Sequence, residues 1–272
     1  MRGQRSIKPF IVLGKVVSRR VEFDQIAPVY DETRRPPSET EVQTLVGLLS
    51  ECQTVLDAGV GTGRYALPLQ ANHFQVVGAD LSVEMMRRAR AKGIRSLLRA
   101  DVRRLPLRDR TMDAAFTAHV LQLIPDPRQV LVELGRVARH VVVVLLPEWS
   151  EHGPSSRWHE LRERYRELAA ELGYPLPERG QRYRHTLEEL TAIAPPALVR
   201  QVQGPLPTGR DLSEWLARWD GRTVAGGQIP LEVHERIVQR LKAERPLDPA
   251  PGTRPRSERF VLWKATDLQT LA

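Results

Sequence analysis

The chain has 272 residues, of which 41% are hydrophobic and 27% charged, an ordinary globular composition that excludes a wholly disordered chain. This length allows one large domain, or a domain with a small cap. The formal net charge of +8 makes a nucleic-acid partner conceivable, but the basic residues are mostly arginines dispersed among acids, which is equally typical of a compositional bias.

Neither a membrane span nor a cysteine-based site is expected. No stretch approaches the roughly 20 apolar residues of a membrane-spanning helix, and the early apolar run 10–17 is interrupted by Lys15 and lacks a signal cleavage site. The single cysteine, Cys52, excludes an internal disulfide and a cysteine-cluster metal site. The sequence therefore predicts a cytoplasmic protein without a metal centre.

From about residue 38 to 147, short apolar runs alternate with segments of helical period. Ser38 and Glu41 form a capping box at the start of the first helix, and Ser82 and Gly93 flank a later one. Such alternation predicts a doubly wound α/β fold with a mostly parallel sheet. We expect strands at 54–57, 75–80, 96–100, 113–118 and 140–146, and helices at 64–71, 83–92 and 126–138.

The pattern changes after Pro147, where proline- and glycine-rich joints separate shorter elements. We expect helices from Ser155 or Ser156 to Gly173 and at 186–193, 211–219 and 231–243, strands at 197–203 and 258–266, and a loop at 244–257. The predicted organisation is an N-terminal extension (1–20), a core (21–147), a mainly helical cap (148–257), and a final strand with a tail (258–272).

A glycine-rich loop follows the first predicted strand, in Asp57-Ala58-Gly59-Val60-Gly61-Thr62-Gly63. Glycine permits positive φ and lets the backbone approach a ligand closely. In an open parallel sheet this loop lies at the carboxyl edge, where ligands bind. Asp80 ends the next strand, where a carboxylate can accept hydrogen bonds from ribose hydroxyls, and Asp101 ends the third.

The glycine spacing separates the classes of nucleotide ligand. A dinucleotide fingerprint needs glycine at position 64, which is Arg64, and a P-loop needs a Gly-Lys-Ser/Thr ending that is absent. The loop 57–63, Asp80, Asp101-Val102 and the segment 116–124 together resemble the class I S-adenosylmethionine-dependent methyltransferases, over about residues 20–147. The resemblance implies a Rossmann-like, seven-stranded, mostly parallel sheet with an antiparallel C-terminal strand.

The resemblance also implies roles for individual residues. Asp80 would bind the ribose, Asp101 and Val102 the adenine, and the glycine loop with Ala118 and His119 would lie near the methionyl group. The segment 23–31 is similar to the N-terminal lid of the ubiquinone/menaquinone-biosynthesis branch. The implied site for S-adenosylmethionine comprises Tyr30, Asp57, Gly59, Gly61, Gly63, Asp80, Leu81, Met85, Asp101, Val102, Ala118 and His119.

Structural alternatives remain open for several of these residues. Asp80 could instead cap the helix after Ser82, and Asp57 could hold the loop amides. His119 could be a hydrogen-bonded histidine beside the sheet, and Met85 could fill core space.

No catalytic residue stands out, and His119, Tyr30, His152 and His185 are candidate bases by residue type alone. Ala118-His119-Val120-Leu121 stands where enzymes that methylate base amines carry Asn/Asp-Pro-Pro-Tyr/Phe, and no cysteine nucleophile is placed for carbon-5 methylation. The sequence therefore favours a small-molecule acceptor. The alternatives are an RNA methyltransferase and an S-adenosylmethionine-binding protein without transferase activity.

Overall fold

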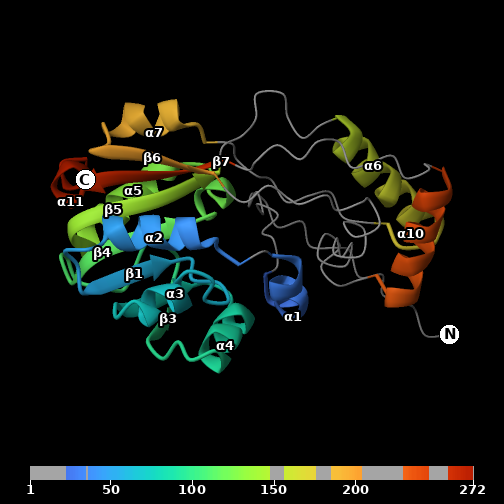
Figure 1. Cartoon of the computed structure of the whole chain (residues 1–272), viewed down its shortest axis with the longest axis horizontal. Coiled ribbons are helices and arrows are strands. Elements are labelled where there is room, and N and C mark those ends of the chain that lie inside the picture. The colour runs from blue at the N-terminus through green and yellow to red at the C-terminus, as the bar shows by residue number, and fades with distance from the viewer. Residues whose placement is uncertain are drawn as a thin grey trace, which may run out of the picture.

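A seven-stranded sheet forms the centre of the computed structural model, which describes residues 23–34, 36–147, 156–175, 185–203, 229–244 and 257–271. The strand order is β3-β2-β1-β4-β5-β7-β6, and β7 runs antiparallel to both of its neighbours (Figure 1). The expected Rossmann-like, mostly parallel sheet with an antiparallel C-terminal strand is confirmed. The strands are β1 (Thr54–Ala58), β2 (Gln75–Asp80), β3 (Leu97–Arg99), β4 (Met112–Ala118), β5 (Ala138–Pro147), β6 (Leu198–Gln203) and β7 (Ser257–Lys264).

Helices cover both faces of the sheet. Alternate residues of β5 show the two layers, because Val142 and Val144 point into one buried apolar cluster while Val143 points into the other. This two-sided burial explains the uninterrupted apolar run of that strand. One face carries α2 (Glu39–Leu48), α3 (Ala66–Ala71) and α4 (Val83–Ala91), and the other carries α5 (Pro127–Val137), α7 (Leu187–Ile193) and α11 (Ala265–Gln269).

Local sequence signals set most helix boundaries. The capping box of Ser38 and Glu41 is formed, and Gly93 follows α4 with a φ of +109°. Several expected boundaries were wrong by one or two residues. The helix α3 begins at Ala66 because the glycine loop continues as turns to Tyr65, β5 begins at Ala138, and β7 ends at Lys264, where α11 begins. The helix expected at 211–219 and most of the loop expected at 244–257 lie outside the described residues.

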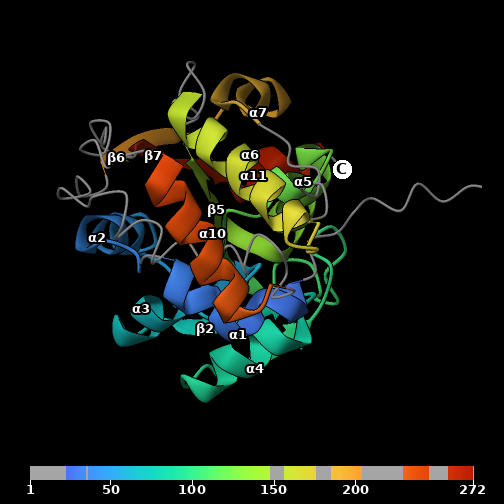
Figure 2. The same ribbon diagram turned by 90° about the vertical axis from the view of Figure 1, so that its right-hand side faces the viewer.

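Two further helices, α6 (Ser156–Glu171) and α10 (Leu231–Glu244), pack on each other away from the sheet (Figures 1 and 2). Their shared core includes Tyr165 and His234, which are joined by a buried hydrogen bond of 2.9 Å between Tyr165 Oη and His234 Nδ1. In Figure 1 the two helices α6 and α10 lie on the side toward which the β1 arrow points. This side is the carboxyl edge of the parallel strands. The domain divisions predicted from the sequence stay a prediction.

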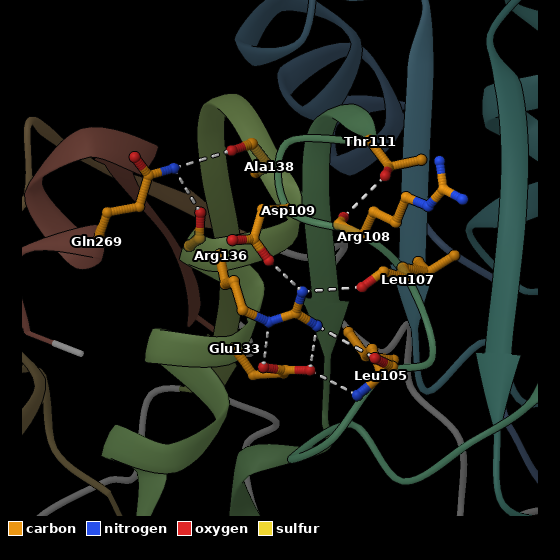
Figure 3. Close-up of polar contacts among 10 residues, drawn as sticks. Leu105, Leu107, Arg108, Asp109, Thr111, Glu133, Arg136, Ala138 and Gln269 are labelled. Atoms are coloured by element: carbon orange, nitrogen blue, oxygen red, sulfur yellow. Dashed lines mark hydrogen bonds and ion pairs between the residues drawn. The ribbon is translucent and has the colours of Figure 1, made fainter.

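A polar network fixes the connection between β3 and β4 onto α5 (Figure 3). The Arg136 guanidinium binds both carboxylate oxygens of Glu133 and one of Asp109, and donates to the carbonyls of Leu105 and Leu107. Despite partial burial, the pKa of Glu133 is lowered by these contacts with Arg136 and by the Leu105 N–H. The network therefore fixes the segment that leads from β3 into β4.

Among the described residues, no helix has both the length and the apolar character that crossing a membrane requires.

Candidate functional site

The glycine loop between β1 and α3 is positioned by the neighbouring strand. The N–H groups of Gly59 and Val60 both donate to the Ala79 carbonyl of β2, at 2.7 and 3.0 Å. Gly59, Gly61 and Gly63 have φ values of +85°, +54° and +87°, a region that side chains other than glycine disfavour. The three glycines are therefore required by the path of the backbone.

The space around the loop differs from one glycine to the next. A Cβ on Gly59 would overlap with Cγ2 of Val120, whereas the nearest atom to a Cβ on Gly61 would be the Gly59 carbonyl oxygen at 4.0 Å. Among the described residues, the backbone of Gly61 therefore borders open space at the carboxyl edge of the sheet. A ligand can approach the main chain there without meeting a side chain.

The Asp80 carboxylate lies directly beside this open backbone. Its Oδ2 accepts the Gly61 N–H at 2.8 Å and its Oδ1 accepts the Ser82 N–H at 2.9 Å. Burial raises the pKa of Asp80, and the backbone N–H groups of Ser82, Gly61 and Leu81 partly offset that shift. The N-cap of α4 is Ser82, so Asp80 does not cap that helix itself but supports its N-cap residue, and the role of Asp80 in binding a ribose stays a prediction. Leu81, which follows, is 43% exposed.

Asp57 has a different environment, although it lies at the same edge. Its side chain is buried under the loop and accepts the Ala66 N–H at the start of α3. Burial, reinforced by the nearby Asp80 carboxylate, raises the pKa of Asp57 to about 7. This contact ties the end of β1 to the start of α3, and the alternative in which Asp57 holds the loop amides stays a prediction.

The helix α1 (Phe23–Thr33) is fastened over the loop and α4 by two carboxylates. Asp31 accepts the Thr62 hydroxyl at 2.5 Å and pairs with Lys92 at 2.6 Å. Partial burial acts to raise the pKa of Asp31, but the hydrogen bonds from Lys92 and Thr62 outweigh it and lower the pKa.

The other end of α1 is held by Asp24. Its carboxylate accepts the Ser82 hydroxyl at 2.6 Å and the Glu84 N–H at 3.1 Å, and the Ser82 contact is the main reason that the pKa of Asp24 is lowered. The two carboxylates thereby tie α1 to Thr62 in the glycine loop and to residues at both ends of α4. Figure 2 shows α1 beside α4.

Two predicted site residues belong to the contact between α1 and α4. Met85 is 1% exposed and packs against Ile26 and Ala27, which matches its core alternative. Tyr30 borders the same cluster, where it meets Phe23 edge-on and lies under the Arg34 guanidinium at 5.3 Å. Tyr30 thus lies on the helix that packs against α4, and its place over a bound cofactor stays a prediction.

Asp101 and Val102 follow β3 at the same edge. The Asp101 carboxylate accepts the Arg103 N–H at 3.0 Å and pairs with the Arg103 guanidinium at 2.6 Å, while Val102 is buried. An adenine amino group would therefore share Asp101 with Arg103.

Ala118 ends β4, and His119 follows it with a φ of +59°. The His119 Nε2 lies 4.0 Å from Oε1 of Glu258, a buried carboxylate at the start of β7. Because Val120 packs on Gly59, this segment lies against the glycine loop.

The structure brings most of the predicted residues to one edge and gives some a structural task. His185 is buried and contacts the Ile124 carbonyl through Nε2 at 2.8 Å, and His152 lies outside the described residues. Sequence reasoning missed Glu258, Asp24 and Asp31. The last two stand seven residues apart, a spacing that places both on one helical face and could have indicated their shared role.

The site fits an adenosyl ligand. The open backbone at Gly61 provides close approach, and the Asp80 oxygens retain lone pairs for ribose hydroxyls beside their two N–H donors. Arg64 stands where a dinucleotide site would have its third glycine.

The fold and this loop define the class I methyltransferase architecture, and comparison with known proteins supports it. The family model of the methyltransferase domain matches residues 56–145. The chain thus carries a class I S-adenosylmethionine-dependent methyltransferase domain, as the sequence resemblance predicted, and the methyl donor of this family is S-adenosylmethionine.

Curated relatives match over the same core. A phosphatidylethanolamine N-methyltransferase of Cereibacter sphaeroides is 37% identical over 100 residues, which cover 33% of this chain and 49% of that relative. The ubiquinone/menaquinone biosynthesis C-methyltransferase UbiE of Syntrophotalea carbinolica is 35% identical over 144 residues, covering 47% of this chain and 60% of that protein. The chain thus spans about half the length of these curated relatives.

A solved S-adenosylmethionine-dependent methyltransferase from Thermotoga maritima shares the fold. It is 19% identical with a TM-score of 0.51, over 88% of this chain and 99% of that one. At this identity the likeness concerns the fold alone.

Proposed function

We propose that this chain transfers a methyl group from S-adenosylmethionine to a small-molecule acceptor. The observation that carries the proposal is the open backbone at Gly61 beside the Asp80 carboxylate, at the carboxyl edge of the sheet. This combination suits a ligand with a ribose and no pyrophosphate.

Each part of the site has a task in such a reaction. Asp80 accepts hydrogen bonds from the ribose hydroxyls, while Val102 and the exposed Leu81 offer apolar surface to the base. The helix α1, fastened by Asp24 and Asp31, covers the loop and excludes water. When bound, S-adenosylmethionine supplies a methyl group already activated on a sulfonium sulfur. The protein therefore mainly aligns the acceptor for an in-line displacement.

Two observations favour a small molecule as the acceptor. Two of the curated relatives are named for phosphatidylethanolamine and for ubiquinone/menaquinone biosynthesis, both of which concern small molecules. The segment Ala118-His119-Val120 after β4 lacks the Asn/Asp-Pro-Pro pattern of enzymes that methylate base amines. We place the acceptor at the carboxyl edge of the sheet, where the glycine loop and Asp80 lie.

The test is transfer of label from methyl-tritiated S-adenosylmethionine into a fractionated metabolite extract. We expect label in the low-molecular-mass fraction with the unaltered chain and none with Asp80→Ala. Tight binding of the donor with no label in any fraction would instead identify a binding protein without transferase activity.

RNA is the second candidate acceptor, and one observation favours it. Residues 84–104 hold eight basic and two acidic residues, so most of the formal net charge of +8 lies along α4, β3 and their loops. Arg90, Arg95 and Arg104 are exposed there. This candidate predicts binding to bulk RNA that weakens steeply as salt rises from 50 to 200 mM, roughly in proportion to the phosphates contacted. If the chain binds no RNA at any of these salt concentrations, this candidate is eliminated.

A further inference from the structure

We propose that His119 and Glu258 act together at this site: His119 takes the proton that the methyl acceptor loses, and Glu258 is the positioning residue that holds the imidazole. The inference rests on the proposed function and deepens it, because it assigns the proton acceptor. The carboxylate Oε1 and the imidazole Nε2 lie 4.0 Å apart, within reach of a charge interaction.

The topology explains why residues 139 positions apart meet. His119 follows the last residue of β4, so it stands at the carboxyl edge of the parallel strands. Because β7 is antiparallel, its beginning lies at that same edge, where Glu258 pairs in register with Pro147 at the end of β5. The antiparallel strand thus delivers an acidic side chain to the ligand edge.

The two side chains differ in solvent exposure, as we expect for a base that meets the acceptor and a carboxylate that positions this base. The His119 side chain is 24% exposed, whereas that of Glu258 is 2% exposed. Polar and cationic groups that face a buried carboxylate stabilise it, and an imidazolium that forms during the reaction would add one such group. His119 is therefore the member that an acceptor can reach.

The backbone holds His119 in place. Its φ of +59° is in the left-handed region, which is unfavourable for a residue with a side chain. Val120, the next residue, packs on Gly59 so closely that no Cβ fits there. Strain of this kind persists where the surrounding structure imposes it, and it is frequent at active sites.

The neighbouring carboxylates at this edge have other partners. Asp57 on β1 accepts the Ala66 N–H, and Asp80 on β2 accepts the N–H groups of Gly61 and Ser82. On β7, Glu258 Oε1 lies 4.0 Å from His119 Nε2.

The proton balance then constrains the acceptor. Its reacting atom gains the methyl carbon, the electron pair of the broken carbon–sulfur bond stays on sulfur, and the proton leaving the acceptor passes to the His119 imidazole. The acceptor must therefore carry a removable proton, as a hydroxyl or an amine with an N–H does. A tertiary amine or a thioether has no such proton.

The test is an NMR titration of the histidine ring signals, which needs no acceptor. Glu258→Gln keeps the shape of the side chain and removes its charge, and His119→Asn identifies the His119 signal. We expect the pH midpoint of His119 to fall by about one unit in Glu258→Gln and to return partly in Glu258→Asp. Glu189→Gln, which removes a carboxylate beside His185, is the matched control and should leave His119 unchanged.

Further measurements keep the proposal falsifiable if Glu258→Gln fails to fold. In the unaltered chain we expect the His119 midpoint above the ordinary value of about 6.5, and the ring signals should shift when S-adenosylhomocysteine is added. A midpoint at or below 6.5, or one unmoved by Glu258→Gln, would overturn the pairing. Ring signals that stay fixed while calorimetry records binding would overturn the placement of His119. Failure of S-adenosylhomocysteine to bind at all would contradict the proposed function instead.

Discussion

At the scale of single residues, the three glycines of the loop differ in what a side chain would meet. Gly59 leaves room for Val120, while Gly61 borders open space. Gly63 faces Ile94, whose Cγ1 would be 3.2 Å from an added Cβ. The pattern Gly-x-Gly-x-Gly is therefore explained by positive φ at all three positions and by packing at only two of them.

This difference predicts separate effects for two alanine substitutions. Gly59→Ala adds a clash with Val120 to the strain of its positive φ and should lower the free energy of unfolding by about 2–4 kcal/mol. Gly61→Ala adds strain alone, about 1–2 kcal/mol, but should weaken binding of S-adenosylhomocysteine. Chemical denaturation and calorimetry measure the two effects.

The control is Gly47→Ala in α2, where a Cβ meets nothing within 4 Å. It should stabilise the chain by roughly 0.5–1 kcal/mol, because alanine is the better helix former. Equal losses of stability for Gly59→Ala and Gly61→Ala would contradict the packing argument.

The buried Asp57 predicts a pH dependence of stability. Its pKa is raised to about 7, so the folded state favours the neutral carboxyl. The contribution to stability is complete below about pH 4 and is lost as the pH rises through about 7, by at most on the order of 4 kcal/mol. Asp57→Asn should flatten the unfolding free energy between pH 5 and 8, measured by urea denaturation.

The control is Asp267→Asn, at an exposed position. It should leave the dependence of the unfolding free energy on pH as it is in the unaltered chain. The same fall in stability with rising pH in Asp57→Asn would show that another group is responsible.

At the scale of elements, the parts predictable from the sequence are those fixed by local pattern. The bounds of β2 agree with its apolar run, and α2 and α4 begin at their capping serines. The helix α1 was not expected as a helix, because Pro28 interrupts its pattern and its position depends on Asp24 and Asp31 binding distant partners.

The fastening of α1 gives a prediction for acid pH. The pKa values of Asp24 and Asp31 are lowered, so their contribution to docking is present above about pH 4 and is lost as the pH falls through their folded values. At neutral pH, Asp31→Asn removes the charge that pairs with Lys92 and should increase hydrogen exchange in residues 23–33 several-fold.

Glu84→Gln is the matched control, since it removes a carboxylate of an exposed pair with Arg87 on α4. Surface pairs of this kind contribute little, so exchange in α1 should not change. Undiminished protection of α1 in Asp31→Asn would show that apolar packing alone holds the helix.

At the scale of the whole molecule, long-range pairing limits what the sequence can predict. The glycine loop and Asp80 were foreseen as one site because both follow strands of a parallel sheet. Glu258 was not, since it follows a proline- and glycine-rich segment and reaches the site only through the pairing of β5 with β7. No local signal marks a glutamate in that position as buried.

A methyl-transfer site at this edge requires that the adenosyl group of the donor lie beside the glycine loop. A crystal structure of the chain with S-adenosylhomocysteine tests this most directly. We predict that the ribose hydroxyls bind the Asp80 carboxylate and that the amino-acid part of the ligand lies along Gly59 to Gly63. Density for this ligand elsewhere on the chain, or no density despite saturating concentration, would contradict the assignment.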